Sequence, residues 1–205
     1  MSLRQWLSRP SALLTIDVQH MFVADGGWFH RLGFDVAPMQ AALPHIARTQ
    51  DLARGHGVPL VHIKSVDDAW SNWPCRIVSP RFVDRLENIA PGDPADRCAL
   101  SPETAPAPGE AVVSKHAHDA FYGTPLSFVL RKMACETVVL SGVTTRGCVE
   151  ATARSAFARG FAVVVVREAV ADPCPEMHEA ALHFIAEHIG IVASADEVRA
   201  ALPKG

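Results

Sequence analysis

Short runs rich in β-branched residues alternate with longer segments of helical periodicity along most of this chain. This alternation is typical of repeated strand–helix–strand units, in which a parallel sheet is buried between helices. We therefore expect an α/β fold with strands over residues 12–18, 58–63, 111–114, 137–141, 161–167 and 191–192. The expected helices cover residues 35–54, with a kink or interruption near Pro44, and residues 125–133, 148–159 and 175–188.

Residues 64–110 interrupt this regular pattern. The stretch is rich in proline, and its periodicity indicates only one helical turn, around residues 82–87. We interpret it as a long crossover, a kind of connection that often carries function. Farther along, Ser194 and Glu197 have the spacing of a capping box and predict a terminal helical turn. No repeat or composition break divides the chain, so we expect one domain over residues 1–205.

The composition excludes several classes of partner. Of the 205 residues, 49% are apolar, and 19 basic against 22 acidic side chains give a formal charge of −3. Binding to nucleic acid or to an anionic membrane therefore has no electrostatic basis, and no apolar stretch approaches the roughly 20 residues that cross a bilayer. The first ten residues lack the apolar block of a signal peptide, and the five cysteines form no C-x-x-C pair. We expect a cytoplasmic protein with free thiols and a small-molecule partner.

Three residues with charged or reactive side chains stand at the ends of expected strands. Asp17 lies near the end of the first strand, Lys115 directly follows the third, and Cys148 begins the helix after the fourth. Ligands bind beyond the carboxyl ends of the strands in an open parallel sheet, which makes these positions candidates for a site. Each residue also has an ordinary interpretation, as a structural ion-pair partner, a surface lysine and a small buried apolar residue, respectively.

The segment at residues 141–148 favours the functional interpretation. It reads Ser-Gly-Val-Thr-Thr-Arg-Gly-Cys and leads from a strand to the N-terminus of a helix, where we expect the helix dipole to lower the pKa of the thiol. Its two glycines permit a tight turn whose backbone N–H groups point at a bound oxyanion. A nucleophile, a carboxylate that takes its proton and a cation that holds the carboxylate ionised are the components of a covalent hydrolase.

These residues lie in three blocks that resemble the isochorismatase-like cysteine hydrolases, a family that includes nicotinamidases, N-carbamoylsarcosine and maleamate amidases, biuret hydrolase and ureidoacrylate amidohydrolase. The blocks are Leu-Thr-Ile-Asp-Val-Gln at residues 14–19, Lys115 with Ala-Phe-Tyr-Gly-Thr-Pro-Leu at 120–126, and Gly-Val-Thr-Thr-Arg-Gly-Cys-Val-Glu-Ala-Thr-Ala at 142–153. Residues 26–28 and 33–36 look most like the ureidoacrylate, biuret and N-carbamoyl branch. Pro173 stands where N-carbamoylsarcosine-like relatives have an arginine, which argues against a carboxylate-bearing substrate of that kind.

The resemblance implies a three-layer α/β/α fold whose six mostly parallel strands have the order 3-2-1-4-5-6. It implies that Asp17 is the general base, Lys115 its positive partner and Cys148 the nucleophile. It also implies a cis peptide bond between Val143 and Thr144, with the amides of Thr144 and Cys148 forming an oxyanion hole. In that strand order Lys115 must extend inward to reach the other two residues. The relatives further suggest a homodimer or homotetramer and no cofactor.

Ten histidines raise the question of a metal ion. Nicotinamidases of the family carry an Asp-x-His set after the second strand, but residues 61–68 break that pattern. His116 and His118 alternate beside Lys115 and could bind metal or substrate. Two imidazoles without a clear carboxylate partner are more often ordinary loop residues, so we predict no metal site.

Further residues near the strand ends are candidates for substrate binding. Aromatic walls around a small planar amide are one interpretation, and simple loop packing is the other. The candidates are Phe22, Trp28, His118, Phe121, Tyr122 and Thr145. Arg146 could face a substrate carboxylate, although solvent exposure or a subunit contact would explain it equally well.

The leading hypothesis is cysteine-dependent hydrolysis of a small amide, ureide or carbamoyl compound through a thioester, with release of ammonia or an amine. One alternative is vinyl-ether hydrolysis of an isochorismate-type substrate. Relatives that perform that reaction do not use the cysteine, so Cys148 argues against it. The other alternative is a catalytically idle ligand-binding or scaffold protein that keeps the fold.

Overall fold

A computed structural model describes residues 1–66 and 98–203 of the chain. Six strands form one parallel sheet in the order β3-β2-β1-β4-β5-β6. The α/β fold and the strand order are those that the sequence predicts. The strands are β1 (Ser11–Ile16), β2 (Leu60–Ser65), β3 (Ala111–Lys115), β4 (Thr137–Val143), β5 (Ala162–Ala171) and β6 (Ile191–Ala193).

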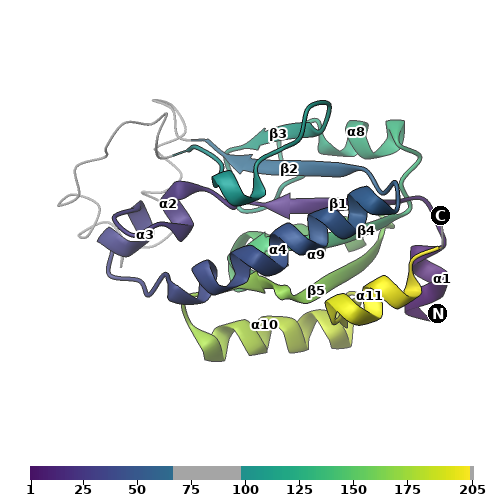
Figure 1. Cartoon of the computed structure of the whole chain (residues 1–205). Coiled ribbons are helices and arrows are strands. Elements are labelled where there is room, and N and C mark those ends of the chain that lie inside the picture. Colours follow the sequence, from purple (N-terminus) through teal and green to yellow (C-terminus); the bar gives the residue numbers. More distant parts are fainter. Residues whose placement is uncertain (67–97, 204–205) are drawn as a thin grey trace.

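Helices cover both faces of the sheet and complete three layers (Figure 1). On one face lie α4 (Ala37–Gly55) and α11 (Ala195–Ala201), and on the other α8 (Leu126–Lys132), α9 (Glu150–Ala158) and α10 (Pro175–His188). Leu14 and Ile16 of β1 belong to the cluster under α8, α9 and α10, whereas Leu13 belongs to the cluster under α4 and α11. Burial on both faces explains why this strand reads as a continuous apolar run.

The strand order reverses direction at β1. The chain moves outward from β1 through β2 to β3 and then returns to β4 on the other side of β1. The carboxyl ends of β1 and β4 therefore border the reversal point, where open α/β sheets bind ligands. The short helices α2 (His20–Val23) and α3 (Trp28–Arg31) lie at this end, and both chain termini lie at the other (Figure 1).

Most expected elements are present with boundaries shifted by a few residues. The helix over residues 175–188 and the capping box of Ser194 and Glu197 are confirmed. Of the kink or interruption expected near Pro44, the interruption is wrong, because α4 continues through this exposed proline, and the kink stays a prediction. The helix expected from Cys148 begins earlier, with the π-helical turn η2 (Thr145–Val149) that leads into α9. The helical turn expected at residues 82–87 falls outside the described residues.

Four short elements are absent from the expectations. The helix α1 (Leu3–Leu7) begins with a capping box of Ser2 and Gln5 and buries Leu7. The helices α2 and α3 have four residues each, and the 3-10 helix η1 (Pro102–Thr104) has three. Segments of this length are shorter than the window in which hydrophobic periodicity distinguishes a helix from a loop.

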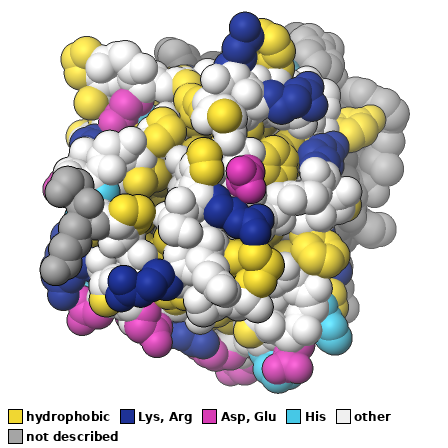
Figure 2. Space-filling model, turned by 90° about the vertical axis from the view of Figure 1, so that its right-hand side faces the viewer, with side chains coloured by type: hydrophobic (Ala, Val, Ile, Leu, Met, Phe, Trp, Pro, Cys, Tyr) yellow, Lys and Arg dark blue, Asp and Glu magenta, His cyan; other side chains and the backbone are white. Residues whose placement is uncertain are grey.

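The end of the molecule near the chain termini presents a mixed surface. Figure 2 shows hydrophobic, basic and acidic side chains interspersed on this face. Such a distribution agrees with the small formal charge of −3. Among residues 1–66 and 98–203, no helix combines the length and apolar character needed to span a bilayer.

Glu110 links three parts of the fold next to β3. Its carboxylate accepts hydrogen bonds from Arg54 Nε of α4 at 2.7 Å and Arg54 Nη2 at 3.0 Å. It also lies 2.7 Å from His62 Nε2 of β2 and accepts the Ala107 N–H at 2.9 Å. The Arg54 hydrogen bonds, with smaller contributions from Ala107 and His62, lower the pKa of Glu110 to about 2. Burial lowers the pKa of His62.

Replacing Glu110 should therefore cost stability in a pH-dependent way. A carboxylate with a lowered folded-state pKa stabilises the fold above its unfolded pKa, and the contribution is lost as the pH falls toward about 2. We expect Glu110→Gln to lower the free energy of unfolding by about 1–3 kcal/mol at pH 7. Asp51→Asn, which removes an exposed partner of the same Arg54, should cost less than about 0.5 kcal/mol. Urea denaturation at pH 7 and pH 3 tests both values, and equal effects of the two variants would contradict this assignment.

Candidate active site

Asp17, Lys115 and Cys148 meet at the carboxyl edge of the sheet. Asp17 directly follows β1, Lys115 is the last residue of β3, and Cys148 lies in η2 after β4. The ammonium of Lys115 is 2.7 Å from Asp17 Oδ2 and 3.4 Å from Cys148 Sγ. The lysine thus extends past the end of β2, as the strand order requires. Three segments that are distant in the sequence form one cluster.

Asp17 is completely buried, and its two carboxylate oxygens have different surroundings. Oδ1 accepts hydrogen bonds from the Ser65 N–H at 3.0 Å and the Ser65 hydroxyl at 3.1 Å. Oδ2 faces the Lys115 ammonium. The backbone of Asp17 has φ 53°, in the left-handed region that aspartate and asparagine tolerate better than most residues. The chain therefore turns sharply out of β1 at the carboxylate.

Lys115 stays charged although its side chain is only 1% exposed. Burial by itself lowers the pKa of this ammonium, but the adjacent Asp17 and Cys148 outweigh burial and raise the pKa above its ordinary value. The ammonium also donates to Ser65 Oγ at 2.9 Å and to the Ala117 carbonyl at 2.8 Å. A buried cation is tolerated only when it is paired and hydrogen-bonded, and these contacts meet that requirement.

The Cys148 thiol is buried and neutral in the free site. Burial, and after it the negative charge of Asp17, raise the pKa of the thiol far above its ordinary value, while Lys115 opposes the shift. The expectation that the helix N-terminus lowers this pKa is therefore wrong. Desolvation and a neighbouring carboxylate outweigh the helix dipole, whose first turn here is π-helical. Formation of a thiolate requires a nearby group that takes the proton.

Two glycines allow the loop that carries Cys148 to approach its neighbours closely. A side chain at Gly142, which has φ 116°, would lie 2.0 Å from the Ile16 carbonyl oxygen of the adjacent strand. A side chain at Gly147 would lie 2.6 Å from Thr144 Oγ1. The intervening peptide bond between Val143 and Thr144 is cis. Packing against the backbone of β1 thus requires a glycine at position 142, whereas a side chain at position 147 would have to displace the Thr144 hydroxyl.

Contacts with β5 and α10 hold the start of η2. The hydroxyl of Thr145, a buried residue, lies 2.8 Å from His178 Nδ1 at the start of α10. Arg146 contacts Asp172 through its backbone N–H at 3.2 Å and through Nε at 3.3 Å. Nε of Arg146 is therefore engaged by a buried carboxylate directly after β5, while the side chain stays 36% exposed.

The remaining substrate-binding candidates have different environments. Phe121 is buried in the core, where its ring stacks on Phe161 with centroids 5.9 Å apart, so core packing accounts for its position. The neighbouring Tyr122 is 70% exposed. Phe22 and Trp28 each contact Phe29, in an aromatic cluster of α2 and α3. These contacts do not connect them with the three clustered residues.

His118 lies close enough to the cluster to sense its charges. Desolvation by the surrounding protein lowers the pKa of the imidazole. The positive charge of Lys115 lowers this pKa further, and the negative charge of Asp17 opposes both effects. The imidazole is therefore neutral at pH 7, although its side chain remains accessible to solvent. Within residues 1–66 and 98–203, no group of three or more His, Cys, Asp or Glu side chains is arranged to hold a metal ion.

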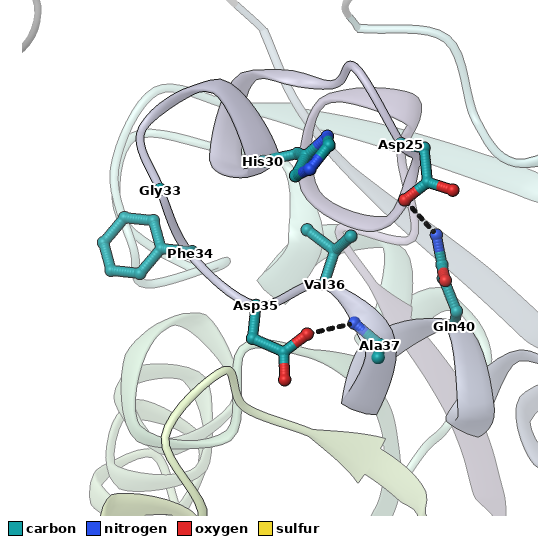
Figure 3. Close-up of a pocket in the computed structure, with 8 residues that line it drawn as sticks. All are labelled: Asp25, His30, Gly33, Phe34, Asp35, Val36, Ala37 and Gln40. Atoms are coloured by element: carbon teal, nitrogen blue, oxygen red, sulfur yellow. Dashed lines mark hydrogen bonds between the residues drawn. The ribbon is translucent and has the colours of Figure 1, made fainter.

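A cavity of about 430 Å³ opens at the segment between α3 and α4. Figure 3 shows Asp25 hydrogen-bonded to Gln40 on one side and Asp35 hydrogen-bonded to the Ala37 N–H on another. His30, Gly33, Phe34 and Val36 complete its lining. Since Asp17, Lys115 and Cys148 do not line it, this cavity is separate from the buried cluster.

Several contacts of the cluster carry no sequence signal. The Ser65 N–H donates to Asp17 and to the side chain of Gln19, and His178 forms a hydrogen bond with Thr145. The sequence does not predict these contacts. Ser65 ends an apolar run and Gln19 follows one, which is the general position of site residues in parallel sheets. That position alone does not distinguish them from other polar residues at strand ends.

Comparison with known proteins identifies the family. The Isochorismatase domain model matches residues 11–197. The ureidoacrylate amidohydrolase RutB of Methylobacterium radiotolerans is 31% identical over 206 residues, which cover 93% of this chain and 78% of that protein. The maleamate amidohydrolase of Pseudomonas putida is 32% identical over 193 residues, which cover 90% and 83% of the two chains.

The fold has a close counterpart among crystal structures. An isochorismatase-like hydrolase from Alkaliphilus metalliredigens superimposes with a TM-score of 0.78, covering 95% of this chain and 97% of that one at 24% identity. The sequence match extends across all six strands and the three clustered residues. The chain therefore belongs to the isochorismatase family and is a hydrolase of C–N bonds.

Proposed function

We propose that this protein is a cysteine-dependent amidohydrolase that acts on a small amide, ureide or carbamoyl compound. The observation that carries the proposal is the Lys115 ammonium, 2.7 Å from Asp17 Oδ2 and 3.4 Å from Cys148 Sγ. It places an acid–base group and a nucleophile on the same cation, which are the components of covalent acyl transfer. The relatives named as ureidoacrylate and maleamate amidohydrolases support amide hydrolysis as the reaction class.

The first step moves the thiol proton to Asp17. Because the raised pKa keeps Cys148 neutral, the thiolate forms only as Asp17 Oδ2 accepts the proton, with Lys115 balancing the negative charge throughout. The sulfur then attacks the carbonyl carbon of the substrate and the carbonyl π electrons move to oxygen. We assign the backbone N–H groups of Thr144 and Cys148 to this oxyanion, as the family resemblance implies.

The second half of the reaction returns the proton. Protonated Asp17 donates it to the leaving nitrogen as the C–N bond breaks, which releases ammonia or an amine and leaves a thioester on Cys148. Asp17, now ionised again, accepts a proton from a water molecule that attacks the thioester. Collapse of the second tetrahedral intermediate releases the acid and re-forms the thiol, so that one water is consumed in each cycle.

His118 lies beside the cluster and is a candidate for substrate contact. His118, neutral at pH 7, can donate or accept a hydrogen bond without adding charge near Asp17. Phe22, Trp28, Phe121, Tyr122 and Thr145 also stay candidates for substrate contact.

The organisation of the protein beyond its fold is likewise a matter of prediction. A single domain over residues 1–205, a homodimer or homotetramer and a cytoplasmic location stay predictions. The scheme uses protein groups and water, and the absence of a metal or cofactor from the reaction stays a prediction.

Two rival functions lead to different results. Vinyl-ether hydrolysis of an isochorismate-type substrate would proceed without the thiol, whereas the proposed reaction stops when the sulfur is removed. An idle ligand-binding protein would release no product from any substrate. The Cys148 sulfur lies 3.4 Å from the ammonium of the buried ion pair, and this position favours the cysteine mechanism over both rival functions.

Replacing the nucleophile tests the proposal directly. We expect Cys148→Ala to lower kcat for ammonia release at least about 1,000-fold, because no other group supplies the acyl acceptor. Cys174→Ala, which removes a half-buried thiol outside the cluster, should keep wild-type activity. A screen over ureidoacrylate analogues, maleamate, biuret, nicotinamide and N-carbamoyl amino acids supplies the substrate. Wild-type turnover by Cys148→Ala would exclude the cysteine mechanism.

The buried ion pair should affect stability and activity separately. Lys115→Met leaves the Asp17 charge buried without its partner, and we expect the free energy of unfolding to fall by about 3–5 kcal/mol. Adding Asp17→Asn, which suits the left-handed backbone at this position, should restore most of that loss while the double variant stays inactive. Urea denaturation and ammonia release measure the two effects. Hydrolysis by the double variant at the wild-type rate would contradict the assigned roles.

A further inference from the structure

Ser65 bridges the two members of the buried ion pair. It is the last residue of β2 and pairs with Lys115 in the register between β2 and β3. Its Oγ lies 3.1 Å from Asp17 Oδ1 and 2.9 Å from Lys115 Nζ. One hydroxyl therefore contacts both the carboxylate and the ammonium of the cluster.

The direction of these two hydrogen bonds is fixed by chemistry. An ammonium has no acceptor lone pair, so Lys115 donates to the Ser65 oxygen. An ionised carboxylate has no proton to give, so the single hydroxyl proton of Ser65 goes to Asp17 Oδ1. This leaves Ser65 unable to rotate without losing one charged partner.

The backbone of Ser65 is held in the same way. Its N–H donates to Asp17 Oδ1 at 3.0 Å and to Gln19 Oε1 at 2.8 Å. The Gln19 amide in turn donates through Nε2 to the carbonyls of Ser65 and Cys98, both at 2.8 Å. The Gln19 side chain is fully buried, and backbone groups on both sides determine its orientation. These contacts thus hold the end of β2 in place independently of its contact with the carboxylate.

We propose that Ser65 is a positioning residue for the acid–base function of Asp17, an inference that rests on the proposed function. By binding Oδ1 with two donors, Ser65 directs Oδ2 toward the Lys115 ammonium, which also contacts the Cys148 sulfur. Its hydroxyl also supports the ionised form of the carboxylate, which is the form that accepts the thiol proton. Without the hydroxyl, Oδ1 keeps only the Ser65 N–H as a donor from this residue, and the carboxylate is held less firmly in its orientation.

The test compares Ser65→Ala with Ser65→Thr, which keeps a hydroxyl. The measurement is the rate at which iodoacetamide alkylates Cys148, followed against pH by peptide mass spectrometry. It is independent of turnover and of the identity of the substrate. Ser11→Ala is the matched control, because Ser11 is a half-buried strand serine whose hydroxyl binds a carbonyl at the opposite end of the sheet.

We expect Ser65→Ala to alkylate about 10- to 100-fold more slowly at pH 7, the range expected for one lost hydrogen bond to a charged group. Ser65→Thr and Ser11→Ala should keep the wild-type profile.

Two results would overturn the proposal. The first is a wild-type alkylation profile for Ser65→Ala, and the second is a Ser65→Thr profile identical to that of Ser65→Ala, which would show that the hydroxyl is not the cause. Circular dichroism melting of each variant shows whether the protein is folded during labelling. Should Cys148→Ala retain hydrolysis, the proposed function would fail, whereas the effect of Ser65 on alkylation would still be measurable.

Discussion

The ion pair between Asp17 and Lys115 is the constraint on which the rest of the site depends. Both side chains are almost fully buried, and two charges in a protein interior are stable only when they are close together and supported by hydrogen bonds. The fold meets this demand by placing the end of β2 between them, so that Ser65 contacts both. The neighbouring β4 then delivers Cys148 to the same cation, with Gly142 allowing its strand to pass close to Ile16.

This arrangement determines that the thiol proton stays on Cys148 in the resting cluster. A sulfur that is buried next to a carboxylate holds its proton more strongly than an exposed thiol, so the resting cluster contains a neutral thiol, a carboxylate and an ammonium. Its net charge is then zero, which is the state that burial favours. Under the proposed mechanism, proton transfer from the thiol to Asp17 is coupled to the attack of the sulfur on an electrophilic carbon.

The sequence predicts the elements whose signals are local or periodic. The strand runs, the helix α10 and the capping box of α11 all follow from residue pattern, and the three blocks of family resemblance point to Asp17, Lys115 and Cys148. The residue pattern does not predict contacts between residues that are distant in the sequence. Ser65 lies 48 positions from Asp17 and 50 from Lys115, so only the pairing of β1, β2 and β3 brings them together. The prediction of a low thiol pKa from the helix N-terminus is wrong, because burial raises this pKa and depends on tertiary packing that the local sequence does not show.

A covalent intermediate on Cys148 is the most direct evidence for the central claim. Acid quenching during turnover of an amide substrate, followed by peptide mass spectrometry, measures whether an acyl group is attached and where. The account predicts an added mass equal to the acyl portion of the substrate on the peptide that contains Cys148, removable by hydroxylamine as expected for a thioester. Steady turnover with the acyl group on another residue would contradict it.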